Sequence, residues 1–258
     1  MSTTIAKMSP AVAGGSPYQL DYATLIAAGY VIPETEVGAA EQYIFDAAVM
    51  DVLRDRLSSY VAVQGDLAVT APSVLTDRVV LDGDYGGLLL NTADQTEITV
   101  AVIYQRPTAT VTNVMPIIGT DTGISGNTGF GIFTADTGGL NLSIRPGTGD
   151  PAIISAVSGA LVPKGSWAFV AASLSATDTA IHLGHGGTLT TATASGVSRD
   201  LANTVYLGKV ADMGASYGSD DLSVRMATVW RSALTADDVL AAYRRARVLC
   251  ARRGWDLV

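Results

Sequence analysis

The stretch Val224-Arg-Met-Ala-Thr-Val-Trp230, near the C-terminus, has the β-branched and aromatic residues of a strand. Arg231-Ser-Ala-Leu234 connects it to Thr235-Ala-Asp-Asp238. There the Thr235 side chain can accept a hydrogen bond from a backbone amide at the start of a helix. The Asp238 side chain can accept another from a free amide at the same helix start, as in a capping box. The sequence therefore predicts a strand that leads through a short turn into a surface helix over about 235–253. Apolar residues then follow at helical spacing, which gives the helix an edge that can pack on a sheet: Val239, Leu240 and Tyr243.

Working outward, residues 61–230 have the texture of a β protein. Short runs of Val, Ile, Thr and Leu are interrupted about every eight to twelve residues by Gly, Asp, Asn and Pro. Ile98–Tyr104, Leu140–Ile144 and Trp167–Ala171 alternate bulky and smaller residues, as a strand with one face in a core requires. This spacing predicts an antiparallel sandwich or barrel and not alternating β and α units.

Two different segments precede the β region. Residues 1–33 contain only two charged side chains, Lys7 and Asp21, and no helical periodicity, which predicts an extended arm that lies on its own body or on another subunit. Residues 34–60 have acids early, arginines late and helix formers between them, which predicts a helix. It would pack on its own domain or, alternatively, mediate oligomerisation. Its apolar stripe comprises Tyr43, Ala47, Met50, Leu53 and Leu57.

Length and composition limit the class of protein. The 258 residues, 48% of them apolar, can bury one large core without a cofactor or crosslink. The single cysteine, Cys250, excludes an intramolecular disulfide, and we expect it to be unreactive. No apolar run is long enough to span a membrane, and the N-terminus lacks a signal-peptide pattern. We therefore expect a soluble chain that is made in a cytoplasm, with no membrane insertion.

The formal net charge of -8 is unevenly distributed. Residues 1–243 hold 11 basic and 23 acidic side chains. Nucleic-acid binding depends on cationic contacts with phosphates, so this acidic body argues against a nucleic-acid partner. We expect the remaining arginines to complement the dipole of the last helix and to meet acidic surface on this chain or a neighbour. They are Arg244, Arg245, Arg247, Arg252 and Arg253.

Seven landmark segments of strand and turn residues follow one another in a fixed order: Arg78–Tyr85, Ile98–Tyr104, Ile117–Gly119, Phe130–Phe133 with Leu140–Ile144, Lys164–Ala171, Val205–Gly208 and Asp221–Trp230. This order resembles that of laminin G-like domains of the concanavalin A-like lectin/glucanase class, and Lys164–Ala171 is the best single match. The resemblance implies a mainly β fold, an antiparallel jelly-roll sandwich over 61–258 with the arm and helix before it and a helix at its end. Two segments depart from the pattern. Ile181–Gly187 lacks the usual aromatic and aspartate, and the acidic pair of the last strand is reduced to Asp220-Asp221.

Enzymatic activity is not expected. The retaining glucanases of this class resemble one another in two glutamates and an aspartate that alternate along one strand, because two carboxyl groups must flank the glycosidic bond. This chain has four glutamates, of which Glu34, Glu36 and Glu41 precede the sandwich and Glu97 stands alone. His182 and His185 lack a third ligand for zinc, and no serine elbow is present.

Ligand and metal sites are predicted from loop residues. The resemblance favours calcium over zinc as a cofactor, although the same aspartates can equally cap turns through their own backbone amides. Trp167 and Trp230 are expected in the core. The calcium candidates are Asp82, Asp84, Asp121, Asp220 and Asp221. The candidates for stacking on a sugar are Tyr217, Tyr85 and Tyr104.

Two functions from different classes follow. Arm-plus-sandwich chains of this composition resemble virion proteins of tailed bacteriophages, which predicts a structural subunit of a tail fibre, spike, baseplate or capsid decoration. Its partners would be other virion proteins and itself, with a trimer favoured, and its location the virion. The alternative is a carbohydrate-binding module that recognises a bacterial surface glycan, a role that a virion protein can also have. A glycan-degrading enzyme is the remote third hypothesis.

Overall fold

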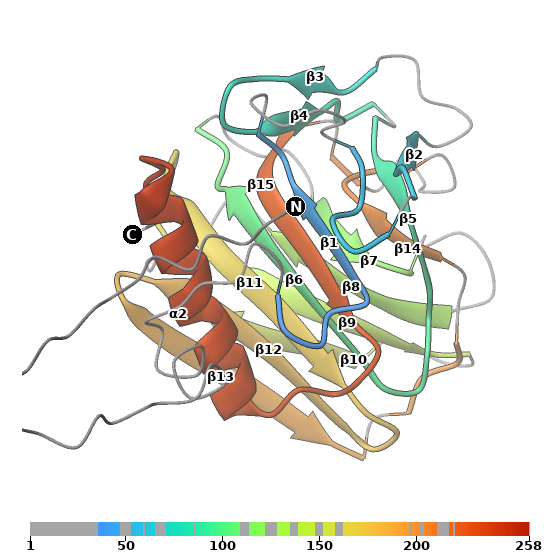
Figure 1. The fold of residues 1–258 in the computed structure, drawn as a ribbon. Coiled ribbons are helices and arrows are strands. Elements are labelled where there is room, and N and C mark those ends of the chain that lie inside the picture. The colour runs from blue at the N-terminus through green and yellow to red at the C-terminus, as the bar shows by residue number, and fades with distance from the viewer. Residues whose placement is uncertain are drawn as a thin grey trace, which may run out of the picture.

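The computed structural model describes residues 36–46, 53–58, 60–64, 71–84, 86–108, 114–121, 128–134, 139–147, 152–157, 162–196, 198–201, 204–210, 217–218 and 220–257. These residues form two antiparallel sheets that lie face to face, with helix α2 (Ala236–Arg252) on the outside of one sheet (Figure 1). The predicted arm, 1–33, lies outside the described residues. Within the described ranges, no helix has the length and apolarity needed to cross a membrane.

The first sheet is built around β15 (Leu222–Trp230), which contains the predicted strand Val224–Trp230. β15 pairs with β6 along one edge. Along its other edge it pairs with β4 at residues 222–224 and with β1 at residues 226–229. The order is β13 (Thr188–Ser195), β12 (Asp178–His185), β11 (Trp167–Leu174), β6 (Ile98–Gln105), β15 (Leu222–Trp230), β4 (Val79–Leu81) and β3 (Ser73–Val74), with β1 (Glu41–Ile44) beside β15.

The second sheet is also antiparallel, and β7, β8, β9 and β10 follow one another in both sequence and space. The order is β10 (Ala152–Val157), β9 (Leu140–Pro146), β8 (Thr128–Thr134), β7 (Met115–Gly119), β14 (Thr204–Leu207), β5 (Leu88–Ala93) and β2 (Val63–Gln64). Each of the seven landmark segments overlaps a strand of one of the two sheets, so the predicted sandwich is confirmed.

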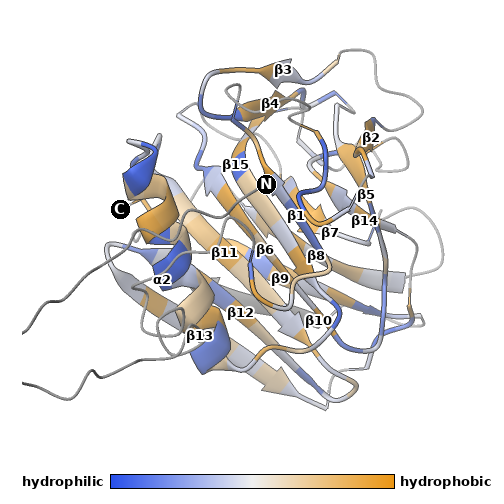
Figure 2. Cartoon of the chain, viewed as in Figure 1, coloured by the Kyte–Doolittle hydropathy of each residue, from blue (hydrophilic) through white to orange (hydrophobic). Residues whose placement is uncertain are grey.

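Helix α2 covers the outer face of the first sheet. Its predicted capping box is present: Thr235 accepts from the Asp238 amide, and the Asp238 side chain accepts from the Thr235 amide. Such a cap contributes about 1 kcal/mol. In Figure 2 the helix alternates hydrophilic and hydrophobic turns. The side chains buried beneath it include Ile103, Trp167, Phe169 and Trp230 from the sheet and Val239, Tyr243 and Cys250 from the helix.

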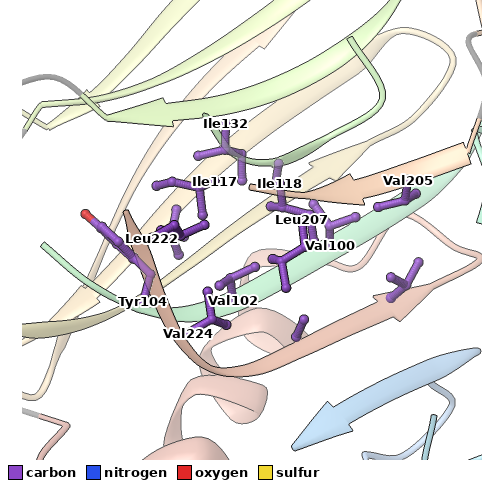
Figure 3. Packing of buried hydrophobic residues seen from close by; sticks show 14 of the residues in the cluster. Val100, Val102, Tyr104, Ile117, Ile118, Ile132, Val205, Leu207, Leu222 and Val224 are labelled. Carbon is purple, nitrogen blue, oxygen red and sulfur yellow. The ribbon is translucent and has the colours of Figure 1, made fainter. Parts of the chain in front are cut away.

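The main core lies between the two sheets. β6 and β15 contribute side chains from one side, and β7, β8 and β14 contribute from the other (Figure 3). Because successive side chains of a strand point to opposite faces, β6 sends half of its residues into this core and half beneath α2. This double burial explains its almost continuous apolar sequence. The residues between the sheets include Val100, Val102, Tyr104, Ile117, Ile132, Leu207 and Val224.

The helix predicted over 34–60 is wrong for the described residues of that span. Glu41–Ile44 forms strand β1, and 53–58 are not helical; residues 47–52 lie outside the described part. The reason is tertiary, because β15 offers a long edge that local helix propensity does not anticipate. Glu41, 1% exposed, then reaches the second sheet and accepts hydrogen bonds from the Asn91 amide at 3.0 Å and from the Thr92 hydroxyl.

Candidate functional site

Two of the three predicted stacking tyrosines, Tyr104 and Tyr217, lie in the described part of the chain. Tyr104 is wrong as a surface candidate, because it lies on β6 between the sheets and is fully buried (Figure 3). Burial raises the pKa of its phenol to about 12. The alternating pattern of β6 showed that one face must be buried, and Tyr104 is on that face. Tyr85 lies outside the described residues.

Tyr217 belongs to a group of side chains at the second sheet. Its ring stacks on Phe133 of β8, with 5.3 Å between the ring centroids, and it is partly buried. Close by, Asp121 accepts from Arg145 Nε at 2.7 Å, and its backbone oxygen accepts from the Tyr206 hydroxyl at 2.7 Å. Burial, followed by the Asp121 charge, raises the pKa of Tyr217. This group satisfies its own polar atoms, so it is a closed structural network more than an open platform.

The other four predicted aspartates gather at one end of the first sheet. Asp82 and Asp84 form the turn after β4, in which Asp82 Oδ1 accepts from the Asp84 amide at 2.7 Å. Asp221 precedes β15 and accepts from the Gly83 amide at 3.1 Å. Asp82 and Asp221 therefore cap the turn through backbone amides, which was the alternative to calcium binding.

A cleft of about 460 Å³ opens beside this turn; we call it the rim cleft. It is lined by Val80, Gln105, Pro107, Thr108, Asp220, Asp221 and Ser223. β15 places Ser223 opposite Gln105, the last residue of β6. The Gln105 amide donates to the Gly165 carbonyl at 2.7 Å, which fixes the orientation of its side chain. Asp220 Oδ2 is buried and has no hydrogen-bond partner among the described residues.

The lining of the rim cleft defines its chemistry. Two carboxylates supply acceptors, and the amide and two hydroxyls supply both donors and acceptors. The described lining contains no histidine, cysteine or cation, and so no nucleophile with an adjacent base. In the described part of the chain, no three His, Cys, Asp or Glu side chains are placed to share a metal ion. Asp121, in the network of the second sheet, does not join the other four aspartates. The arrangement is suited to hydrogen bonding with a polar, uncharged ligand.

Two of the remaining titratable candidates, His182 and Cys250, are buried. His182 is 1% exposed, its Nδ1 lies 2.9 Å from the Thr191 hydroxyl, and burial lowers its pKa to about 4. His185 is three residues further along β12 and therefore faces the opposite side. Cys250 is buried, and burial raises the pKa of its thiol to about 11, which favours the protonated form over the nucleophilic thiolate.

Two arginines of the C-terminal cluster meet acidic side chains of this chain, as predicted. Arg245 binds Glu36 through two nitrogens, with Nη2 at 2.7 Å and Nε at 3.0 Å from Oε2. Arg253 pairs with Asp46. These two contacts fasten α2 to the segment around β1, which sequence alone could not place beside the helix.

Comparison with known proteins gives neither a family nor a close relative. No family model matches the sequence, and no curated protein matches it. Solved structures do match. The Trypanosoma rangeli sialidase in complex with sialic acid superposes with a TM-score of 0.58 at 13% identity, over 86% of this chain and 34% of that chain.

Toxin binding domains give similar matches. The binding domain of Paraclostridial Mosquitocidal Protein 1 matches with a TM-score of 0.60 at 10% identity, over 80% of this chain and 52% of that chain. The botulinum neurotoxin serotype D ligand binding domain in complex with N-acetylneuraminic acid has a TM-score of 0.52 at 16% identity, over 80% and 50%. This chain thus spans about a third of the sialidase and about half of the toxin domains. At these identities the likeness shows the fold, which is the concanavalin A-like lectin/glucanase sandwich, with a helix after its last strand.

Proposed function

We propose that this chain is a non-enzymatic glycan-binding module and that the rim cleft holds the sugar. The observation that carries the proposal is that Asp220, whose buried Oδ2 has no hydrogen-bond partner among the described residues, lines a cleft together with other hydrogen-bonding side chains. A buried acceptor without a partner costs about 1–3 kcal/mol. A ligand hydroxyl that donates to this oxygen would recover that free energy.

The chemistry of the cleft favours a neutral sugar. Neighbouring sugar hydroxyls donate to carboxylates and also exchange hydrogen bonds with amides and hydroxyls, which are the groups that Gln105, Thr108 and Ser223 provide. Asp220 and Asp221 make the cleft negative, so an anionic sugar would be repelled. A volume of about 460 Å³ is within the usual range for small-molecule sites.

The structural neighbours support a glycan ligand without specifying it. The sialidase and the serotype D toxin domain were both solved with sialic acid bound. One fold hosts many functions, so this support is by analogy. The virion hypothesis stays a prediction from sequence, because the neighbours named above are a sialidase and toxin binding domains. A glycan-binding role is compatible with it.

A glycan array, probed with and without a calcium chelator, tests the proposal. We expect binding to a set of neutral glycans by the wild-type chain. Asp220→Asn should lose this binding, because it removes the charged acceptor while preserving shape. Asp237→Asn is the matched control, since it removes an exposed carboxylate from the first turn of α2. An array that stays silent in both conditions, or an Asp220→Asn variant that binds like the wild type, would overturn the proposal.

A further inference from the structure

A second groove, of about 680 Å³, runs beside the last turns of α2; we call it the α2 groove. Its charged lining residues are Arg244, Arg247 and Asp256. Apolar side chains form much of its surface, namely Val248, Ala251 and Leu257. The lining of the groove therefore combines a net positive charge with apolar side chains, in a chain whose formal charge is -8.

The two arginines of this groove differ from those that fasten the helix. Arg245 and Arg253 are neutralised by Glu36 and Asp46. In the described part of the chain, Arg244 and Arg247 form no ion pair, and Arg247 lies 5.9 Å from the centroid of the Tyr243 ring. The helix dipole does not account for them, because its effect is confined to the last turn and both lie more than one turn before Arg252.

Helical geometry places these side chains around one strip. Arg244, Val248 and Ala251 are four and three residues apart and share a face, and Arg247 is on its flank. The opposite wall is rigid, because Trp255 is 8% exposed and lies against the guanidinium groups of Arg225 and Arg253, at 5.4 Å and 5.3 Å. The groove thus presents two unpaired guanidinium groups at the edge of a fixed apolar surface.

We propose that the α2 groove binds a sugar acid, a sugar ring that bears a carboxylate. The guanidinium groups of Arg244 and Arg247 match a carboxylate in geometry and charge. The apolar face of the ring would lie on Val248, Ala251 and Leu257. The choice of a sugar over an acidic peptide rests on the proposed glycan-binding function. The module would then recognise a neutral unit in the rim cleft and an acidic unit in the α2 groove.

Calorimetric titration of the whole chain tests the proposal, with oligogalacturonate and N-acetylneuraminic acid as probes and their methyl esters as uncharged counterparts. We expect at least one acid to bind at least tenfold more tightly than its ester. Arg244→Gln and Arg247→Gln should each weaken that binding at least tenfold. Arg231→Gln, which removes an exposed charge outside the groove, should leave it unchanged. Circular dichroism checks that the variants are folded.

The proposal is overturned if neither acid binds, if acid and ester bind equally, or if Arg231→Gln weakens binding as much as Arg244→Gln. Tighter binding of poly-glutamate through the same two arginines would also overturn it in favour of an acidic peptide. Asp220→Asn separates this proposal from the first. Neutral-glycan binding that depends on Asp220, without binding of either acid, removes the α2 groove alone. Binding of no sugar of either kind removes both proposals.

Discussion

The rim cleft and the α2 groove open on the same side of the first sheet but are opposite in charge. Val80, Gln105 and Ser223 of the rim cleft alternate with residues of the inter-sheet core, so they face the side that α2 covers. Strand ends that are distant in sequence build the acidic cleft, whereas consecutive turns of one helix supply both arginines of the basic groove. The difference teaches that one face of this sandwich carries two depressions whose linings are opposite in charge.

The largest expected effect distinguishes paired from unpaired arginines on α2. Arg245→Ala leaves Glu36, with a side chain 7% exposed, as a buried charge without its partner. Breaking such a pair costs about 3–5 kcal/mol. Arg244→Ala should change stability by less than about 0.5 kcal/mol, because no ion pair is lost. Urea unfolding of both variants measures this contrast. Equal destabilisation would mean that Arg244 is structural and would weaken the case for a ligand.

Acidification should lower the free energy of unfolding through His182, which lies on the side of the first sheet that α2 covers. This side chain pairs in register with Ala171, which is buried beneath α2, so it faces the same side. Burial lowers its pKa from about 6.5 to about 4 in the folded chain. The unfolded chain therefore binds a proton first, and stability, complete above pH 6.5, falls as the pH decreases toward 4. The loss is at most about 1.4 kcal/mol per pH unit.

Unfolding of His182→Gln over the same pH range isolates this contribution. Its stability should depend less steeply on pH than that of the wild type between pH 6.5 and 4, while both keep the contributions of the carboxyl groups. Curves of the same slope would show that His182 is not the responsible group.

Salt should change the ligand affinities of the rim cleft and the α2 groove by different factors. This is the smallest of the predicted effects. The Debye length falls from about 10 Å at 0.1 M salt to about 3 Å at 1 M. Binding of a sugar acid in the α2 groove should therefore weaken about threefold to tenfold over this range. Binding of a neutral glycan in the rim cleft should change less than twofold. Calorimetry at both concentrations measures the contrast, and parallel weakening would argue against two separate sites.

Much of the fold could be predicted because its signals are local. Alternation predicted β6, β9 and β11, and Thr235 with Asp238 predicted the start of α2. β1 could not be predicted, because Glu41–Ile44 becomes a strand by pairing with the edge of β15, more than 180 residues away. The local pattern of that segment favoured a helix, and only the edge that it meets in space decides otherwise.

The sites were predictable to different degrees for the same reason. The arginine cluster is contiguous in sequence, so its presence on α2 was visible, although its division into paired and unpaired members was not. Asp220 and Asp221 were predicted as loop carboxylates for calcium and not as glycan ligands. Gln105 and Thr108 were missed, since they join the aspartates only through the pairing of β6 with β15. A polar residue that ends an apolar strand, as Gln105 does, is the signal that could have suggested it.

The most direct test of the central claim is the affinity of the Asp220→Asn variant for a neutral glycan that the wild-type chain binds, measured by calorimetry above pH 7. A charged hydrogen bond to a ligand is worth about 1.5–3 kcal/mol. The predicted result is a loss of affinity of about tenfold to a hundredfold, with the Arg244→Gln variant binding as tightly as the wild type. An Asp220→Asn variant that binds the glycan with undiminished affinity would contradict the assignment of the rim cleft.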